Sequence, residues 1–361
     1  MQLNDRIVIK NIYHMLAYAY QNLNEKDEEK LSAEAFENIH NLFAAILCQG
    51  IAALVKRGLN HDYICETEET GSLKGKLNLA ASVKRQSMIK KRLVCQYDIF
   101  SENILLNQVL KTTMLLLLRY GDINHFNRTL LRKRLVFFNR IDEISPSLIS
   151  WDSISYHRNN VTYRMLINVC QLIIKGLLQT SDNGHYNLAK FLDDQQMSHL
   201  YEKFVLAYYR REHPELSATA SYIDWAVENK EDLCFLPSMK SDIMLSYEDK
   251  RLIIDTKYYS HTMQKNPMSN RETYISGNLY QIFAYVKNKD KQQTGKVNGV
   301  LLYAQTIDEE TPEKSFLIGG NLFGIHVLNL NTEWNIICRQ LDFLLEKYLN
   351  LFDRKTYNYI T

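Results

Sequence analysis

Apolar and polar positions form a short, regular pattern between residues 239 and 259. Two apolar runs, Ile243–Leu245 and Leu252–Ile254, flank the polar stretch Tyr247–Lys250. Runs of this length on either side of a polar stretch are typical of two antiparallel strands joined by a tight turn. The segment is therefore expected to form a β-hairpin.

Two aspartates lie at matching positions of this hairpin. A turn centred between Glu248 and Asp249 places Asp242 directly opposite Asp255. Opposed side chains have Cβ atoms about 5 Å apart, and ionising both carboxylates at that separation is costly without a cation between them. Oxygen ligands with room for water suit Mg²⁺ or Mn²⁺ better than zinc. Asp242 and Asp255 are therefore expected to bind a divalent metal ion.

Lys257 lies beyond Asp255 on the same strand. The strand period puts its ammonium group on the face of the carboxylates and turns Thr256 away. A metal ion there can polarise a phosphodiester and lower the pKa of a bound water, while Lys257 orients that water or offsets transition-state charge. The alternative is an ordinary ion pair, because an Asp-x-Lys triplet alone is common. The Ile- and Leu-rich hairpin favours a site, since half-buried charges are costly to keep.

A helix is expected after the hairpin. Four apolar residues there recur at helical spacing: Leu279, Ile282, Phe283 and Val286. Ser276 precedes them as a suitable N-cap. Gln281 and Tyr285 are one helical turn apart and lie off this stripe. They either line a groove beside the hairpin or form a solvated polar face.

A second helix is expected upstream of the hairpin. Its apolar stripe consists of Met197, Leu200, Tyr201, Phe204 and Tyr208. Glu202 lies at the edge of this stripe. By spacing alone it is a surface glutamate.

The order of these polar residues resembles that of a known superfamily. Glu202, Asp242, Asp255-Thr256-Lys257 and Gln281-x-x-x-Tyr285 are similar to the PD-(D/E)xK nucleases, in particular to the branch with a Q-x-x-x-Y motif. Ser241, rather than proline, precedes Asp242, and this branch often lacks that proline.

Further segments resemble the McrC subunits of McrBC modified-cytosine restriction systems. They are Asn11-Ile-Tyr-His-Met-Leu-Ala-Tyr-Ala, Arg57-Gly-Leu, Gly71-Ser-Leu-Lys-Gly-Lys-Leu, Gly184-His-Tyr, Leu200-Tyr-Glu-Lys-Phe and Asn278-Leu-Tyr-Gln. The likeness runs over nearly the whole chain.

The resemblance implies a Mg²⁺-dependent DNA endonuclease subunit that acts with a hexameric AAA+ GTPase on double-stranded DNA containing methylated cytosine. By position it assigns catalytic roles to Asp242, Asp255 and Lys257, an accessory motif to Gln281 and Tyr285, and the helical acid to Glu202. Two alternatives stay open. The chain is either a noncatalytic activator of the GTPase, whose charged triad is structural, or a self-sufficient repair or recombination nuclease.

The length and composition of the chain indicate two domains. It has 361 residues, which is longer than a chain that folds around one core usually is. Hydrophobic residues make up 46% of it, enough to build more than one core. Pro146 and the polar run 150–160 mark the expected boundary. We expect a mixed α/β protein with a helical, partner-binding domain at residues 1–160. A restriction-endonuclease-like core at residues 161–361, with a mixed sheet flanked by helices, is expected to follow.

An insertion of short β-like pieces interrupts the helical pattern at about residues 66–97. In the McrC resemblance this insertion is a projecting finger that enters the pore of the partner ring and stimulates its GTPase. The residues expected to contact the partner are Lys74, Lys76, Lys84, Arg85, Lys90, Lys91 and Arg92. The alternatives are a surface excursion that packs on its own domain and a basic run that contacts DNA.

Other features bear on the cellular location. Six cysteines are scattered without a C-x-x-C pair, which argues against a zinc site or a disulfide framework. The N-terminus lacks a secretory pattern, and apolar runs such as residues 114–118 are too short to span a bilayer. A cytoplasmic protein without membrane association is expected. The net charge of +2 is too small to indicate nucleic-acid binding by itself.

Overall fold

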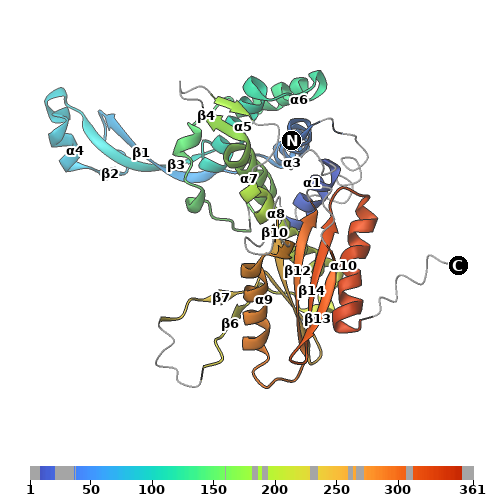
Figure 1. Cartoon of the computed structure of the whole chain (residues 1–361). Helices are drawn as coiled ribbons and strands as arrows, with labels where there is room; N and C mark the ends of the chain where they lie inside the picture. The colour runs from blue at the N-terminus through green and yellow to red at the C-terminus, as the bar shows by residue number, and fades with distance from the viewer. Residues whose placement is uncertain are drawn as a thin grey trace. The chain divides into compact units, whose positions relative to one another are not determined.

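The computed structural model describes residues 9–20, 36, 38–158, 160–180, 186–188, 194–227, 235–258, 263–265, 272–305 and 312–351. Gly184 and His185 of the sequence motifs lie outside these ranges. The chain forms two compact units, coloured by residue number in Figure 1. Unit 1 comprises residues 1–21, 28–39 and 190–361, and unit 2 comprises residues 22–27 and 40–189.

This division differs from the predicted boundary at residue 160. Helix α7 (Tyr163–Gln171) packs on α5 (Leu105–Tyr120) and so belongs to unit 2. Helix α1 (Ile9–Tyr20) packs on α8 (Asp194–Glu212) and so belongs to unit 1. Of the polar run 150–160, residues 150–158 and 160 form short turns within unit 2 rather than a linker.

Unit 2 is built mainly from helices, as its sequence pattern predicts. Helix α3 (Ile39–Arg57) ends at Gly58, whose φ is +86° and whose amide donates to the Val55 carbonyl at 3.2 Å. Helix α5 ends before Gly121, whose amide donates to the Leu117 carbonyl, and α7 continues as a π-helix, η6 (Leu172–Leu177). The remaining elements are α6 (His125–Leu135), β4 (Leu178–Thr180) and β5 (Tyr186–Leu188).

In the described part of the chain, α3 is long and apolar enough to cross a membrane by length and composition. The stretch that meets this criterion is 67% buried inside the protein. Helix α3 therefore packs as a core helix of unit 2.

A long antiparallel hairpin projects from the helices of unit 2 (Figure 1). Its strands β1 (Asp62–Thr70) and β3 (Leu93–Ser101) pair along their whole length, and β2 (Lys76–Leu77) joins β3. We call residues 62–101 the arm. It contains the predicted insertion and extends beyond it on both sides.

The basic stretch at the end of the arm is helical, not β-like as predicted. Helix α4 (Leu79–Lys84) is followed by a single 3₁₀ turn, η2 (Ser87–Lys90). Asn78 caps α4, because its side-chain oxygen accepts a hydrogen bond from the Ala81 amide at 3.0 Å. This side-chain cap gives the helix a start that apolar spacing alone did not reveal.

A five-stranded mixed sheet forms the centre of unit 1, in the order β13-β14-β12-β9-β8. Its strands are β8 (Ile243–Tyr247), β9 (Lys250–Lys257), β12 (Val297–Gln305), β13 (Lys314–Ile318) and β14 (Asn321–Asn329). Strand β12 is parallel to β9 and β14, while the two edge strands are antiparallel to their neighbours. Two small pairs accompany it: β6 (Tyr222–Ile223) with β7 (Met239–Lys240), and β10 (Met263–Lys265) with β11 (Glu272–Tyr274).

The predicted hairpin and its register are confirmed. Ile243 pairs with Ile254, and Tyr247 pairs with Lys250. Glu248 occupies the turn with φ of +49°. This register places position 242 across from position 255, just beyond the paired part of β8.

Helix α9 (Ser276–Lys289) covers one face of the sheet. Ile282, Tyr285 and Val286 form a buried cluster with residues such as Ile253 and Leu301. The buried side of the helix is therefore rotated from the predicted stripe, because aromatic Tyr285 adds to the apolar face. Leu252 and Ile254, whose side chains point to the other face of β9, are buried as well, so the sheet is covered on both sides.

The first residue of α9 also differs from the prediction. Ser276 is the first helical residue, and Ile275 occupies the N-cap position without a side-chain hydrogen bond. The Ser276 hydroxyl instead accepts a hydrogen bond from the Gln264 side chain at 3.3 Å.

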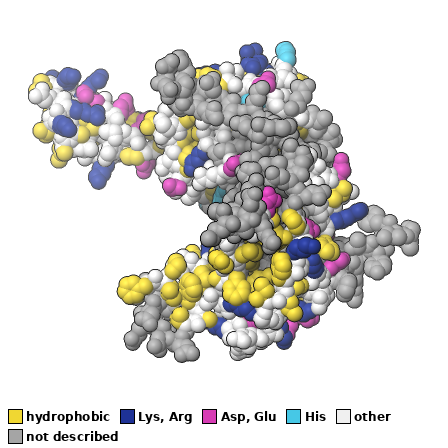
Figure 2. All heavy atoms as spheres, viewed as in Figure 1, with side chains coloured by type: hydrophobic (Ala, Val, Ile, Leu, Met, Phe, Trp, Pro, Cys, Tyr) yellow, Lys and Arg dark blue, Asp and Glu magenta, His cyan; other side chains and the backbone are white. Residues whose placement is uncertain are grey.

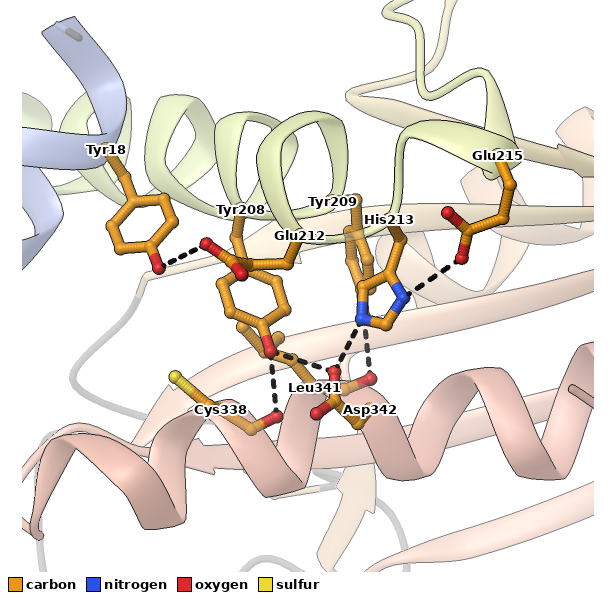
Figure 3. Close-up of polar contacts among 9 residues, drawn as sticks. All are labelled: Tyr18, Tyr208, Tyr209, Glu212, His213, Glu215, Cys338, Leu341 and Asp342. Carbon is orange, nitrogen blue, oxygen red and sulfur yellow. Dashed lines mark hydrogen bonds and ion pairs between the residues drawn. The ribbon is translucent and has the colours of Figure 1, made fainter. Parts of the chain in front are cut away.

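Three helices of unit 1 meet in a polar cluster (Figure 3). The Tyr18 hydroxyl of α1 donates to Glu212 of α8 at 2.8 Å. Asp342 of α10 (Trp334–Leu349) accepts from the Tyr208 hydroxyl of α8 at 2.8 Å, and its Oδ1 lies 2.8 Å from Nε2 of His213. These bonds connect the C-terminal turn of α8 with both of its neighbours.

Candidate active site

Asp255 and Lys257 lie near the C-terminal end of β9, on the face that α9 covers. Ile253, which shares their strand parity, belongs to the cluster around α9. Asp255 is 0% exposed, and neither of its carboxylate oxygens accepts a hydrogen bond of regular geometry. The Lys257 Nζ atom lies 2.6 Å from its Oδ2 as an ion pair. Burial raises the pKa of Asp255 to about 6, against the lowering effect of Lys257.

Asp242 lies immediately before β8 and approaches β9 from its edge. Its Oδ2 accepts hydrogen bonds from the Thr256 amide at 2.8 Å and from the Thr256 hydroxyl at 2.9 Å. The prediction that Thr256 turns away from the carboxylates was therefore wrong for Asp242. Because β8 begins at Ile243, the Asp242 carboxylate replaces the missing ladder partner of the Thr256 amide. Both bonds use Oδ2, so Oδ1 of Asp242 takes no part in holding Thr256.

Gln281 and Tyr285 reach the site from α9. The Lys257 ammonium donates to Oε1 of Gln281 at 3.1 Å, and Nε2 of Gln281 donates to the Tyr285 hydroxyl at 2.8 Å. The interpretation of these residues as a solvated polar face was therefore wrong. Gln281 fixes the position of the ammonium group between α9 and the Asp255 carboxylate.

Glu202 of α8 belongs to the same electrostatic cluster. Burial and the charge of Asp242 raise its pKa, whereas Lys240, Lys203 and Lys257 lower it. The charge of Glu202 in turn contributes to the raised pKa of Asp255. Glu202 is thus more than a surface residue, and sequence spacing alone had not singled out Lys240 or Lys203.

The side chains suit a small, oxygen-seeking cation. Within the described ranges, no group of three or more His, Cys, Asp and Glu side chains is arranged to hold a metal ion. Mg²⁺ keeps several water ligands and is often bound through one or two carboxylates, which is the kind of donor that Asp242 and Asp255 offer. The buried Oδ1 of Asp255 accepts no hydrogen bond and faces no ammonium group as Oδ2 does, so it is a polar atom that such an ion would satisfy.

The seven basic residues predicted to contact a partner all lie on the arm and are all exposed. Lys74 is partly engaged within the arm, since its Nζ lies 3.9 Å from Glu68 and 3.8 Å from the Tyr97 ring centroid. Figure 2 shows basic and hydrophobic side chains side by side on the arm. The exposed apolar residues near its end are Leu73, Leu79, Val83, Met88 and Ile89. The sequence pattern indicated only the basic residues of the arm, although these apolar residues alternate with them along the chain.

The chain is similar to known restriction proteins over most of its length. Over 349 residues the chain is 28% identical to the type IV methyl-directed restriction enzyme EcoKMcrBC of Escherichia coli K12, covering 95% of this chain and 98% of that one. It is also similar in fold to a chain of a half-complex of Thermococcus gammatolerans McrB AAA+ hexamers with bound McrC. That match has a TM-score of 0.51 and 16% identity, and covers 94% of this chain and 75% of the other.

The family model of the McrBC 5-methylcytosine restriction system component matches residues 2–304. That range contains α8, the β8–β9 hairpin and α9, so it includes every residue of the candidate site. The chain therefore belongs to the McrBC 5-methylcytosine restriction system component family.

Proposed function

We propose that this chain is the DNA-cleaving subunit of a GTP-dependent restriction complex that acts on double-stranded DNA containing methylated cytosine. The single observation that carries this proposal is the convergence of Asp255, Lys257 and Gln281 in a buried ionic cluster beside Asp242. A fully buried carboxylate without regular hydrogen bonds is costly to fold and is typical of functional sites. The fold of unit 1, a mixed sheet flanked by helices, agrees with a PD-(D/E)xK nuclease core.

Each side chain has a distinct task in this proposal. Asp242 and Asp255 would hold Mg²⁺, which when bound supplies positive charge beside the scissile phosphodiester. Lys257 orients the attacking water or offsets negative charge as the phosphate is attacked. Gln281 and Tyr285 position the ammonium group, and Glu202 shapes the field around both aspartates.

We also propose that the arm contacts a hexameric AAA+ GTPase and stimulates it. The solved half-complex that this fold resembles contains McrB AAA+ hexamers with bound McrC. The arm presents exposed basic residues beside exposed apolar ones, a combination suited to a protein interface. Nuclease and activator roles would then belong to different units of one chain.

The nuclease proposal is tested by Asp242→Ala and Lys257→Ala in the complete complex with GTP, Mg²⁺ and methylated DNA. Both variants should lose cleavage while keeping partner binding and stimulation of GTP turnover. Asp249→Ala is a matched control, because Asp249 lies in the exposed turn of the same hairpin. Full cleavage by either site variant contradicts the catalytic assignment.

The two alternatives are separated by measuring GTP turnover and DNA cleavage independently, with and without a chelator. A noncatalytic activator stimulates GTP turnover but yields no cleavage that a chelator abolishes. A self-sufficient nuclease cleaves DNA without the partner. The proposed subunit needs both the partner and Mg²⁺ to cut.

A further inference from the structure

The β6–β7 pair carries an exposed aromatic side chain next to the candidate active site. Tyr222 is 68% exposed and pairs across the ladder with Lys240. The Lys240 Nζ atom lies 5.8 Å from the centroid of the Tyr222 ring. Exposed tyrosines are common, so its significance depends on how it is held and what lies beside it.

The backbone beneath Tyr222 is firmly anchored. Its neighbour Ile223 is buried in the main cluster of unit 1 together with Met239 of β7. The Trp225 indole donates to the Pro237 carbonyl at 2.7 Å. This bond connects the segment that follows β6 with the segment that precedes β7. The ring is thus presented on a fixed strand pair rather than on a loose loop.

The pairing of β6 with β7 also places Tyr222 beside a residue that lies two positions before Asp242. Lys240 is followed by Ser241 and Asp242, and the Ser241 amide donates to the Ser221 carbonyl at 3.0 Å. Tyr222 and Lys240 therefore border the same cluster that contains Asp242.

Hydrophobic side chains gather on the face of unit 1 that carries β6, β7 and α9 (Figure 2). The exposed aromatic residues of this region are Tyr222, Phe235, Tyr280 and Phe283. Of these, Tyr222 is the one paired with a lysine at the edge of the acidic cluster. An aromatic face beside a cation is the combination that single-stranded nucleic acid uses, with bases stacked on rings and phosphates held by lysine.

We propose that Tyr222 is a stacking platform for an unpaired base of the DNA strand that enters the site, with Lys240 holding the adjacent phosphate. The inference rests on the proposed nuclease function and specifies its substrate: DNA that is locally unpaired at the point of cleavage. The Lys240 ammonium group lies over one side of the tyrosine ring, and the base stacks on the exposed remainder. Tyr222 acts as a substrate-positioning residue and takes no part in the chemical step.

The test is binding of a fluorescent oligonucleotide to the purified full chain in chelator, so that no cleavage occurs. The same sequence is offered as a single strand and as a duplex. Tyr222→Ala should weaken single-strand binding roughly 5- to 100-fold and leave duplex binding unchanged. Tyr222→Phe should restore single-strand binding, because it keeps the aromatic face.

Two further variants complete the experiment. Tyr280→Ala removes another exposed tyrosine of the same face and should bind both oligonucleotides like the wild type. Lys240→Ala should weaken binding of both forms and reduce the salt dependence of binding by about one phosphate contact. Thermal melts of each variant establish that the fold is intact.

Equal single-strand binding by wild type and Tyr222→Ala overturns the proposal. So does a Tyr222→Ala variant that loses only its association with the AAA+ partner, since that assigns the ring to a protein interface. The nuclease proposal is tested separately. If single-strand binding depends on Tyr222 but the complex never cleaves DNA, the stacking role stands and the nuclease proposal fails. If the Tyr222→Ala variant binds a single strand like the wild type and the complex cleaves DNA, the nuclease proposal stands and the stacking role fails.

Discussion

Asp255 is the residue whose environment departs furthest from what a carboxylate prefers. Burial raises its pKa from 3.8 to about 6, despite the nearby Lys257. The folded pKa lies above the unfolded value, so the protonated form is favoured by folding. The stability from this group is fully present below about pH 4 and is lost as pH rises through about 6.

Asp255→Asn mimics the protonated carboxyl, so at about pH 8 in chelator it should melt at a higher temperature than the wild type. For a domain of this size the gain is roughly 2–4 °C per kcal/mol. The difference should shrink as pH falls below about 6. Added Mg²⁺ should stabilise the wild type but not the variant. An Asn variant that melts lower at every pH contradicts the argument.

Gln281 is held by two hydrogen bonds that can be removed separately. Gln281→Leu keeps the approximate volume but removes the contact with Lys257 at 3.1 Å, so the ammonium group loses its fixed position. Cleavage in single turnovers should fall by roughly 100-fold, the scale expected for a small displacement of a reacting group. Partner binding should not change.

Tyr285→Phe is the milder control for this contact, because it removes only the acceptor of the Gln281 amide at 2.8 Å. The loss should stay within about 10-fold, as expected for one ordinary hydrogen bond. If Tyr285→Phe costs more than Gln281→Leu, the hydroxyl has a role beyond positioning Gln281.

At this scale, periodicity predicted which residues meet but not every contact that they make. Lys257 shares the face of Asp255 because both follow the strand period, and that pairing could be predicted. The bonds between Asp242 and Thr256 could not, because they depend on β8 beginning one residue after Asp242.

The junction of α8 and α10 is an element-scale feature with its own pH dependence. His213 follows α8, and its ring nitrogens contact Asp342 at 2.8 Å and Glu215 at 3.3 Å (Figure 3). Burial alone would lower the pKa of His213, but the hydrogen bonds and charges of Asp342 and Glu215 outweigh it and raise the pKa above 6.5. Tyr208 also faces this cluster through its bond to Asp342.

Because the folded pKa of His213 lies above its unfolded value, its stabilisation is fully present below about pH 6.5 and is lost as pH rises through the folded pKa. The melting temperature of unit 1 should therefore fall over that range. His213→Gln should flatten this part of the profile, and the exposed His125→Gln should not. If the melting temperature of the wild type changes with pH as that of His213→Gln does, His213 is not the cause of the pH dependence.

Elements with a clear amphipathic pattern could be predicted, but their partners could not. A helical start of the chain was expected, yet the pattern does not reveal that helix α1 packs on α8, far along the chain. Strand β13 gave no signal, because all five of its residues are exposed and no face alternates. Strand β14 is buried at most positions on both faces, so it lacks alternation as well.

At the scale of the whole molecule, the candidate site and the arm belong to different units of the chain. The sequence indicated two functional regions, but the division at residue 160 separated α7 from α5, on which it packs. Long-range packing decides such boundaries, and a polar run only marks a surface segment. A change at the candidate site should therefore spare stimulation of the partner, and a change in the arm should spare metal binding at the site.

The arm provides the sharpest test of this separation. Ile89 is 80% exposed between Met88 and Lys90, so a charge placed there should not disturb the fold. Burying such a side chain at an interface contributes about 1.5–3 kcal/mol, and Ile89→Asp replaces that gain with a desolvation penalty. The concentration of chain needed to stimulate GTP turnover of the AAA+ partner should rise at least about 10-fold.

Leu148→Asp is the matched control, because Leu148 is a 76% exposed apolar residue of the same unit outside the arm. It should stimulate the partner like the wild type. Ile89→Asp should still gain thermal stability from Mg²⁺, since Asp242 and Asp255 lie in the other unit, although DNA cleavage by the complex falls with the lost partner contact. Normal stimulation by Ile89→Asp would move the partner contact away from the end of the arm. Loss of the Mg²⁺ response would mean that the two units do not act independently.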